Sequence, residues 1–130
     1  LMLIDTSAAI AILLAEPEAD RFCEAIAEAP TRLMSAVSRV EAGILIEARK
    51  GVGGRESLEA LLEQSGISVV DFTAADADRA LHGWRRYGKG NHPARLNFAD
   101  CCVYALCKAT GEPLLFNGED FPRTDLKLLR

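Results

Sequence analysis

The sequence contains few of the residues that usually build zinc, disulfide or covalent-catalytic sites. It has two histidines, four cysteines and only 6% aromatic residues. No two cysteines form a C-x-x-C pair, and His82 and His92 supply no zinc-ligand pattern. We therefore expect neither a zinc site nor a disulfide framework. The expected state is four reduced, buried thiols that pack as small hydrophobic side chains: Cys23, Cys101, Cys102 and Cys107.

Long apolar segments are also missing. No apolar run approaches the length that spans a bilayer, and the first five residues lack the basic region of a signal peptide. Hydrophobic residues make up 49% and charged residues 26% of the 130 residues, which is a globular composition. These features predict one domain over residues 1–130 and a cytoplasmic protein.

Negative charge is absent from one stretch of an otherwise acidic chain. The formal net charge is −4, yet no Asp or Glu occurs between Arg79 and Ala99, a stretch with five basic residues. Aromatic residues lie among these cations, an arrangement that suits phosphate contacts and base stacking on an unpaired RNA strand. The alternative is a solvated helix end with Trp84 packed inward. The predicted RNA contacts are Arg85, Arg86, Lys89 and Arg95.

Strand-like apolar segments alternate with segments of helical periodicity along the chain. Strands are expected at residues 2–5, 31–35, 67–70 and 114–116, with a short fifth one at 126–129. Helices are expected between them, with Thr6 and Ser7 capping the first and the glycines at 51–54 ending the third. This order predicts a three-layer α/β/α fold with a mostly parallel sheet of four to five strands. Such sheets bind ligands at the carboxyl ends of their strands.

Two aspartates lie at those strand ends. Asp5 directly follows the first strand, and Asp120 lies in the turn after the strand at 114–116. For Asp5 alone, capping the next helix is an equally good explanation. Both side chains are nevertheless expected at the edge of the sheet where ligands bind.

Two further acids interrupt apolar helix faces. Glu41 falls within a stripe that we expect to face the core, formed by Val37, Val40, Ile44, Leu45 and Ala48. Asp100 shares a stripe with Val103, Tyr104 and Cys107 on a helix that is apolar nearly all round. A carboxylate facing the core is costly unless a cation or several donors meet it. The four acids therefore predict one acidic cavity formed by Asp5, Glu41, Asp100 and Asp120.

Clustered carboxylates need a counter-charge, and a hard divalent ion supplies one. We predict Mg²⁺ or Mn²⁺ held by Asp5, Asp100 and Asp120, because the set lacks imidazole and thiolate ligands. Such an ion polarises a phosphoryl oxygen and activates a water, so the four acids suit direct hydrolysis of a phosphodiester. Hydroxyl groups beside the acids would orient the ligands or a water, with local backbone bonding as the alternative role: Thr6, Ser7 and Ser38.

Four short motifs occur in order along the chain. Asp5-Thr6-Ser7-Ala8 ends the first strand, and Ser38-Arg39-Val40-Glu41 carries the helical glutamate. Leu96-Asn97-Phe98-Ala99-Asp100-Cys101 begins the apolar helix, and residues 111–116 and 118–125 form the last strand and loop. In their order and spacing these motifs resemble the VapC-like PIN domains, the ribonuclease toxins of type II toxin–antitoxin systems.

The resemblance implies a PIN fold and an Mg²⁺- or Mn²⁺-dependent endoribonuclease that cuts tRNA or rRNA and so inhibits translation. It also implies a cognate VapB-like antitoxin and commonly a toxin homodimer. By matching positions, it places Asp5, Glu41, Asp100 and Asp120 in the acidic site. Many relatives have Asn or Asp where this chain has Glu119, which leaves the roles of Glu119 and its neighbour Asn117 open.

Three alternatives fit the sequence less well. A haloacid-dehalogenase-like phosphatase needs a second aspartate two residues after the first, and Ser7 stands there. A phospho-accepting receiver domain needs a lysine after a late strand, and Asn117-Gly118-Glu119 offers none. A catalytically silent PIN-like interaction module would not need all four acids. Cleavage of RNA with and without Mn²⁺ separates this module from the enzyme.

Overall fold

The computed structural model describes residues 1–129, and a parallel β-sheet of five strands lies at its centre. β1 (Met2–Ile4) is the middle strand. β2 (Arg32–Ser35) and then β3 (Ile67–Val70) lie on one side of it, and β4 (Leu114–Leu115) and then β5 (Leu128–Leu129) lie on the other. All four pairings are parallel. The predicted α/β fold with a parallel sheet of four to five strands is therefore confirmed.

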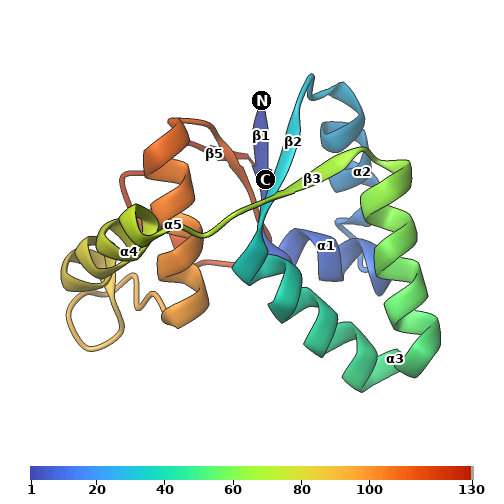
Figure 1. The fold of residues 1–130 in the computed structure, drawn as a ribbon, viewed down its shortest axis with the longest axis horizontal. Coiled ribbons are helices and arrows are strands. Elements are labelled where there is room, and N and C mark those ends of the chain that lie inside the picture. Colours follow the sequence, from blue (N-terminus) through green and yellow to red (C-terminus); the bar gives the residue numbers. More distant parts are fainter. Residues whose placement is uncertain (130) are drawn as a thin grey trace.

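Within residues 1–129, five α-helices cover the two faces of this sheet (Figure 1). α1 (Thr6–Leu13), α2 (Ala19–Glu28) and α3 (Ala36–Gln64) lie on one side, and α4 (Ala74–Tyr87) and α5 (Phe98–Thr110) lie on the other. A 3₁₀ turn, η1 (Phe121–Arg123), precedes β5. None of these described helices combines the length and the apolar character needed to cross a bilayer.

The central strands are buried on both faces, as strands between two helical layers must be. Side chains of β1 alternate between the layers: Leu3 packs against α5, whereas Met2 and Ile4 pack among residues of α1 and α2. β4 alternates in the same way with Leu114 and Leu115. Two hydrophobic cores result, one on each face, and they hold the ends of β1 and β4 in fixed positions.

Local hydrogen bonds set the helix ends. Asp5, and not Thr6 or Ser7, caps α1, because the extended backbone at Asp5 lets its carboxylate accept the Ser7 N–H at 3.1 Å. The cap predicted at Thr6 and Ser7 was therefore wrong by one to two residues, whereas the capping role offered as the alternative for Asp5 is confirmed. Thr73 caps α4, with a reciprocal hydrogen bond from its N–H to Asp76. The expected glycine break between two helices is a kink inside α3, where Gly51 has a φ of 62° and a ψ of −147°.

The inward face of α3 differs from the predicted stripe. Val40 and Ile44 are 60% and 65% exposed, whereas Ser38 and Ala42 are buried. These small residues let α3 approach α1 so closely that the Thr6 hydroxyl donates to the Ser38 carbonyl at 3.2 Å. Larger side chains on this face would keep the two helices apart. The prediction failed because the buried face follows Ser38, Ala42 and Ile46 at intervals of four residues, a stripe that begins with a polar residue.

The cysteines are free thiols, and three of the four are buried as expected. Cys101, Cys102 and Cys107 lie in the core side of α5. Cys23 is exposed, because its neighbour Phe22 takes the inward position on α2. The prediction of a buried thiol was therefore wrong for Cys23.

Candidate active site

The order of the strands opens a crevice beside β1. From β1 the chain moves outward to β2 and β3 and later returns to place β4 on the other side of β1. Where connections leave neighbouring parallel strands in opposite directions, the carboxyl ends of the strands flank a ligand-binding crevice. Asp5 follows β1 at this point, and the loop containing Asp120 follows β4. A cavity of about 280 Å³ lies here, called the acidic cavity below.

The acidic cavity brings together all four acids that the sequence singled out. Asp5 comes from the end of β1, Glu41 from α3, Asp100 from α5 and Asp120 from the loop after β4. No Lys, Arg or His is among the described residues that line it. The remaining lining residues are Thr6, Ser7, Ile10, Glu16, Leu45, Phe116, Asn117 and Phe121. The cavity is therefore strongly negative when its carboxyl groups ionise.

Asp5 is the most deeply placed of the acids. Its backbone N–H donates to the Leu115 carbonyl at 3.0 Å, which ties it to the end of β4. Its carboxylate accepts from the hydroxyl of Ser7 at 2.5 Å and from the Ser7 N–H. Burial and, to a smaller extent, the nearby charge of Glu41 raise the pKa of Asp5 to about 6, against the effect of these hydrogen bonds. A proton or a cation is therefore favoured at this carboxyl group.

Asp100 combines a structural role with a place in the cavity. It is the third residue of α5, and its carboxylate accepts the N–H of the N-cap residue Asn97 at 3.1 Å. Burial raises the pKa of Asp100 to about 7, and the charges of Asp5, Asp120 and Glu41 add to the effect. The four carboxyl groups thus interact electrostatically through the cavity.

Glu41 and Asp120 lie closer to solvent than the other two acids. Glu41 is half-buried on the flank of α3, beside the buried face rather than within it. Asp120 is exposed and takes the N-cap position of η1 without a side-chain hydrogen bond to the turn. These two side chains can therefore change their orientation with little cost to the fold.

Two further polar residues reach the cavity, and one of them was not expected. Asn117, whose role the sequence left open, donates its backbone N–H to the Ser7 hydroxyl at 2.9 Å. Its side-chain amide donates to Glu16 at 3.3 Å. Glu16 arrives because Ala15, at a φ of 52°, turns the chain back after α1. No periodicity or motif marks this left-handed turn, so Glu16 could not be assigned to the cavity from the sequence.

The three predicted supporting hydroxyls take different places. Ser7 joins Asp5 to Asn117, and so it links the ends of β1 and β4. Thr6 donates to the backbone of Ser38 and holds α3 against α1. The hydroxyl of Ser38 is buried and has no hydrogen-bond partner among the described residues. Only Ser7 touches an acid directly.

Comparison with known proteins agrees with this architecture. The model of the PIN domain family matches residues 2–127. The chain is 47% identical over 125 residues to "Ribonuclease VapC" of Mycolicibacterium smegmatis, an alignment that covers 96% of this chain and 97% of that relative. The chain belongs to the VapC-like PIN-domain family.

Solved structures share the fold at lower sequence identity. The crystal structure of Mycobacterium tuberculosis VapC20, a sarcin–ricin loop cleaving toxin, has a TM-score of 0.80 and 19% identity over 100% of this chain and 99% of that one. VapBC2 of Rickettsia felis, bound to a DNA fragment from its promoter, has a TM-score of 0.79 and 17% identity over 98% and 96%. The resemblance to VapC-like PIN domains that the motifs indicated is confirmed.

The donor set of the VapC-like site suits a hard divalent cation, although two of its carboxylates also accept hydrogen bonds from neighbouring residues. Only carboxylate, hydroxyl and amide oxygens face the cavity, as Mg²⁺ and Mn²⁺ prefer. Among residues 1–129, no group of three His, Cys, Asp or Glu residues is arranged to hold a metal ion. The carboxylate of Asp100 instead accepts from Asn97, and that of Asp5 accepts from Ser7. A cation would offset the repulsion that raises the pKa of Asp100.

The predicted RNA-contacting residues divide into two groups. Lys89 and Arg95 line a second cavity next to the acids. Arg85 and Arg86 lie on α4 and line neither cavity. Arg86 forms an ion pair with Asp125 at 3.4 Å. Glu119 lines the second cavity and not the acidic one.

Proposed function

We propose that this chain is the toxin of a type II toxin–antitoxin pair and an Mg²⁺- or Mn²⁺-dependent endoribonuclease. It would hydrolyse phosphodiester bonds of tRNA or rRNA and thereby inhibit translation. The observation that carries this proposal is the acidic cavity, in which four carboxyl groups meet without a Lys, Arg or His among the described lining residues. Membership of a family whose relatives include a protein named a ribonuclease supports it.

Asp5, Asp100 and Asp120 are the residues that would hold the metal ion. The ion supplies positive charge for a phosphoryl oxygen and lowers the pKa of water. Ser7 would keep one oxygen of Asp5 engaged, so that the other remains available to the cavity. Asp120, which makes no capping bond, would turn inward. Asp100 would release the N–H of Asn97.

Glu41 has the position of a proton acceptor. It is half-buried at the mouth of the acidic cavity, on a helix that the bond from Thr6 to Ser38 fixes in place. In the proposed reaction a water oxygen attacks phosphorus, Glu41 takes one proton, and the bond between phosphorus and one ribose oxygen breaks. That ribose oxygen receives a proton, so one fragment ends in phosphate and the other in a hydroxyl group.

RNA cleavage with and without metal tests this function. Purified wild-type chain is incubated with total RNA in Mn²⁺, in Mg²⁺ and in excess EDTA, and the fragment ends are sequenced. We expect discrete cuts in either metal and none in EDTA, because the carboxylates alone supply no positive charge to the phosphate. Equal cleavage in EDTA would overturn the metal-dependent mechanism, and the absence of cuts in any metal would overturn the nuclease.

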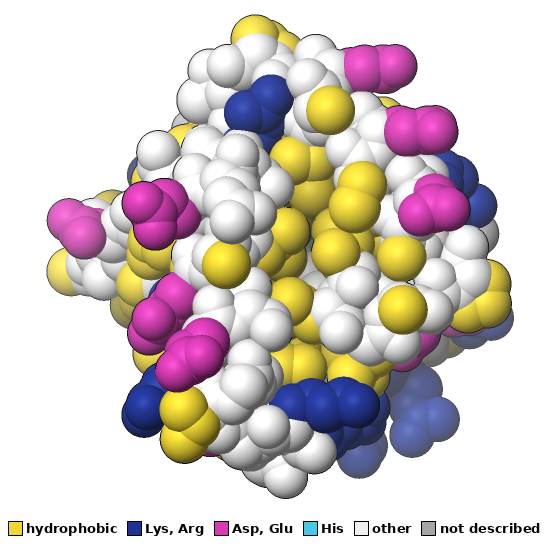
Figure 2. All heavy atoms as spheres, turned by 90° about the vertical axis from the view of Figure 1, so that its right-hand side faces the viewer, with side chains coloured by type: hydrophobic (Ala, Val, Ile, Leu, Met, Phe, Trp, Pro, Cys, Tyr) yellow, Lys and Arg dark blue, Asp and Glu magenta, His cyan; other side chains and the backbone are white. Residues whose placement is uncertain are grey.

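A cognate VapB-like antitoxin is the second part of the proposal. Figure 2 shows hydrophobic side chains gathered at the centre of the face that α1, α2 and α3 form, with charged side chains around them. Half-buried apolar residues of this side include Ile10 and Leu13 of α1, Leu14 directly after it, and Leu62 of α3. Ile10 also lines the acidic cavity. An apolar segment bound here would therefore reach the acids.

The inhibitor would place an arginine between the carboxylates. A guanidinium group binds two carboxylates in a fork and removes the charge that a metal ion would otherwise balance. We expect the antitoxin encoded beside this chain to abolish cleavage. Replacing one arginine in its C-terminal segment should restore much of the cleavage without dissolving the complex, as size-exclusion chromatography would show. Full inhibition by every arginine variant would contradict this mode.

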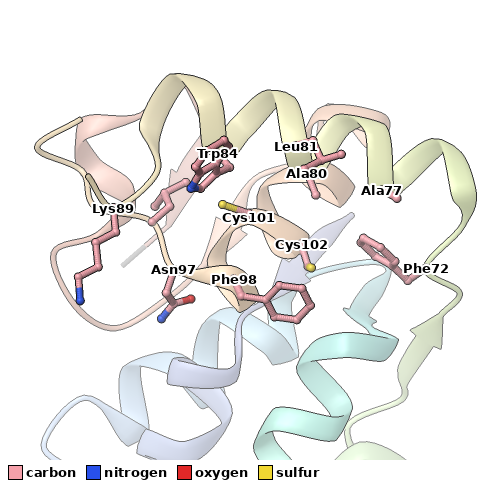
Figure 3. Close-up of a pocket in the computed structure, with 11 residues that line it drawn as sticks. Phe72, Ala77, Ala80, Leu81, Trp84, Lys89, Asn97, Phe98, Cys101 and Cys102 are labelled. Atoms are coloured by element: carbon pink, nitrogen blue, oxygen red, sulfur yellow. The ribbon is translucent and has the colours of Figure 1, made fainter. Parts of the chain in front are cut away.

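A homodimer is the third part of the proposal. An apolar groove of about 560 Å³ lies between α4 and α5, with Trp84 and Phe72 at opposite ends and Cys101 and Cys102 between them (Figure 3). Phe98 lines it and is 79% exposed. A second copy of the chain would cover this face by self-complementary packing about a two-fold axis.

The dimer is tested by changing Phe98. We expect Phe98→Glu to give a monomer in analytical ultracentrifugation, because a charge would be buried in an apolar interface. Val52→Glu is the matched control, since Val52 is 56% exposed on α3 and lies outside the groove. A Phe98→Glu variant with the same mass as the wild type would exclude this face as the dimer interface.

A further inference from the structure

A second cavity continues from the acidic cavity toward α4. Its volume is about 520 Å³, and Asp100 and Asp120 line both cavities. Lys89, Arg95 and Arg123 also line it, and we call it the cationic cavity after these three side chains. Glu119, Asn97, Pro93, Ala94 and Pro122 complete its lining. A polymer that crosses the acidic cavity in this direction must pass these cations.

The three cations have no acidic partner among the described residues, unlike Arg79 and Arg86 of α4. Within residues 1–129, neither Lys89, Arg95 nor Arg123 forms an ion pair. By contrast, Arg79 pairs with Asp76 at 2.9 Å, and Arg86 pairs with Asp125 at 3.4 Å. The carboxylates of Asp100, Glu119 and Asp120 line the same cavity, yet the three cations form no ion pair among the described residues, so their N–H donors are available to an anion.

The loop that carries two of these cations is held by its own backbone. Lys89 donates its N–H to the Leu96 carbonyl at 3.0 Å, and Leu96 donates to the Tyr87 carbonyl at 3.0 Å. Leu96 is fully buried and anchors the end of the loop. The side chains of Lys89 and Arg95 therefore start from fixed positions, which lowers the entropy cost of binding a ligand.

Arg95 has a left-handed backbone, with a φ of 55°. This conformation is unfavourable for residues with a Cβ atom, and glycine adopts it more readily. Strained residues of this kind cluster at functional sites. Its guanidinium group lies at the cationic cavity, and no described ion pair explains the choice of arginine at a position that suits glycine.

Arg123 joins the two loops around the cavity. It ends η1, three residues after Asp120, and its guanidinium donates to the Pro93 carbonyl at 3.5 Å. This contact leaves further N–H donors of the fork available for an anion. One short turn thus carries both Asp120 and Arg123, so the backbone fixes the distance between their Cα atoms.

We propose that Lys89, Arg95 and Arg123 bind the phosphate that neighbours the scissile phosphodiester in a single-stranded RNA. The inference rests on the proposed ribonuclease function and adds to it the path of the strand, from the acidic cavity to the cationic one. Three unpaired cations match the backbone of a polyanion, which runs continuously past both cavities. Arg123 is a binding residue that the basic composition of residues 79–99 did not reveal.

Binding without cleavage is the direct test. The Asp5→Asn chain, in Mn²⁺, is titrated into a fluorescein-labelled oligouridylate at several salt concentrations. Adding Arg95→Gln or Arg123→Gln should raise the Kd at low salt by about threefold to tenfold. It should also lower the slope of log Kd against log salt by about 0.7 for each lost contact. Arg49→Gln, which removes the same charge from α3 outside both cavities, should change neither value.

A second variant separates binding from folding. Arg95→Gly removes the cation and also the strain at a φ of 55°, so its melting temperature should match or exceed that of the parent chain while its Kd rises. A purely structural arginine would show lower stability instead. Arg123→Lys keeps the charge and should keep most of the affinity.

The outcomes distinguish this inference from the function on which it rests. Unchanged Kd in Arg95→Gln and Arg123→Gln, in a chain whose wild type cuts RNA, would overturn the cationic site and leave the nuclease standing. Arginine-dependent binding of oligouridylate by a wild type that cuts no RNA would overturn the nuclease and leave the site. If both variants bind RNA normally but bind the antitoxin more weakly, the cavity is a protein contact and the proposal is wrong.

Discussion

The acidic cavity and the cationic cavity meet at Asp100 and Asp120, yet they are built in different ways. Asp5 lies between β1 and α1, and Glu41 and Asp100 stand on α3 and α5, all elements that pack in the hydrophobic cores. Asp120 stands on the loop after β4. The cations stand on the loop after α4 and on η1. One site is fixed by the core of the fold, and the other is fixed by hydrogen bonds within loops.

This difference sets the physical character of each site. Burial raises the pKa of Asp5 and of Asp100, so ionising these carboxyl groups destabilises the folded state. A metal ion or a partner's cation would offset this cost. The cationic residues, by contrast, are exposed. Changes in the acidic cavity are therefore expected to alter catalysis, whereas changes in the cationic cavity alter affinity.

The largest effect is expected from Asp100→Asn, which tests whether the acidic cavity carries catalysis. The change keeps the shape of the side chain and the bond to Asn97, but it removes a ligand charge. Because changes to groups behind a metal ligand already cost about 10–100-fold, the loss of RNA cleavage in Mn²⁺ should be at least about a hundredfold. Single-turnover cleavage measures it, and circular dichroism checks the fold.

Asp78→Asn is the matched control for this variant. Asp78 is exposed on α4 and lines neither cavity, so cleavage should be unchanged. If Asp100→Asn cleaved RNA at the wild-type rate, the role of Asp100 would be confined to capping α5. Asp100 lines both cavities, and its change would then give no support for assigning catalysis to the acidic cavity.

A smaller effect is expected from Ser7→Ala. The hydroxyl of Ser7 donates to Asp5 and accepts from the Asn117 N–H, so it orients a metal ligand and joins two strand ends. Its loss should lower the cleavage rate by about tenfold, as for other groups behind a ligand. Ser57→Ala is the control, because Ser57 bonds only to the Gly53 carbonyl on the exposed side of α3. Equal rates in both variants would remove Ser7 from the site.

The sequence revealed the acidic cavity because its members conflict with their surroundings. Asp100 stands among Val103, Tyr104 and Cys107, which are all buried, and Asp5 ends a buried strand. Such conflicts are visible in one dimension, since the period of a helix or strand assigns each residue to a face. Glu41 lines the cavity as predicted, but it does not share a buried stripe with Val40 and Ile44, because both of these side chains are exposed.

The parts that the sequence did not reveal depend on loop conformation. Glu16 reaches the acidic cavity through the left-handed backbone of Ala15, and Arg123 reaches the cationic cavity through η1. Neither turn contains a glycine that would mark it in the sequence. The spacing of charges suggested Arg86 as an RNA contact, but it could not show that Asp125, thirty-nine residues away, pairs with it. Tertiary contacts of this kind have no local signature.

The smallest effect concerns stability in the absence of metal. It tests whether ionising the acids of the shared cavity destabilises the fold. The pKa of Asp5 rises from its ordinary value of 3.8 to about 6 on folding, and that of Asp100 rises to about 7. The folded state therefore holds more protons than the unfolded state between pH 4 and 7, and stability falls as pH rises through this window. Asp76 and Asp125 have a lowered pKa, so their contribution is already complete at pH 5.

In EDTA, the wild-type chain should therefore melt at a lower temperature at pH 7.5 than at pH 5. Asp5→Asn removes an ionisation that burial opposes, and the amide oxygen of Asn can still accept from Ser7. The variant should be more stable than the wild type at pH 7.5, by about 3–6 °C in Tm, and its Tm should depend less on pH. Differential scanning calorimetry at the two pH values measures both effects. A variant that melts lower than the wild type at pH 7.5 would show that the Asp5 carboxylate stabilises the fold. Ionisation in the acidic cavity would then not be the destabilising feature proposed here.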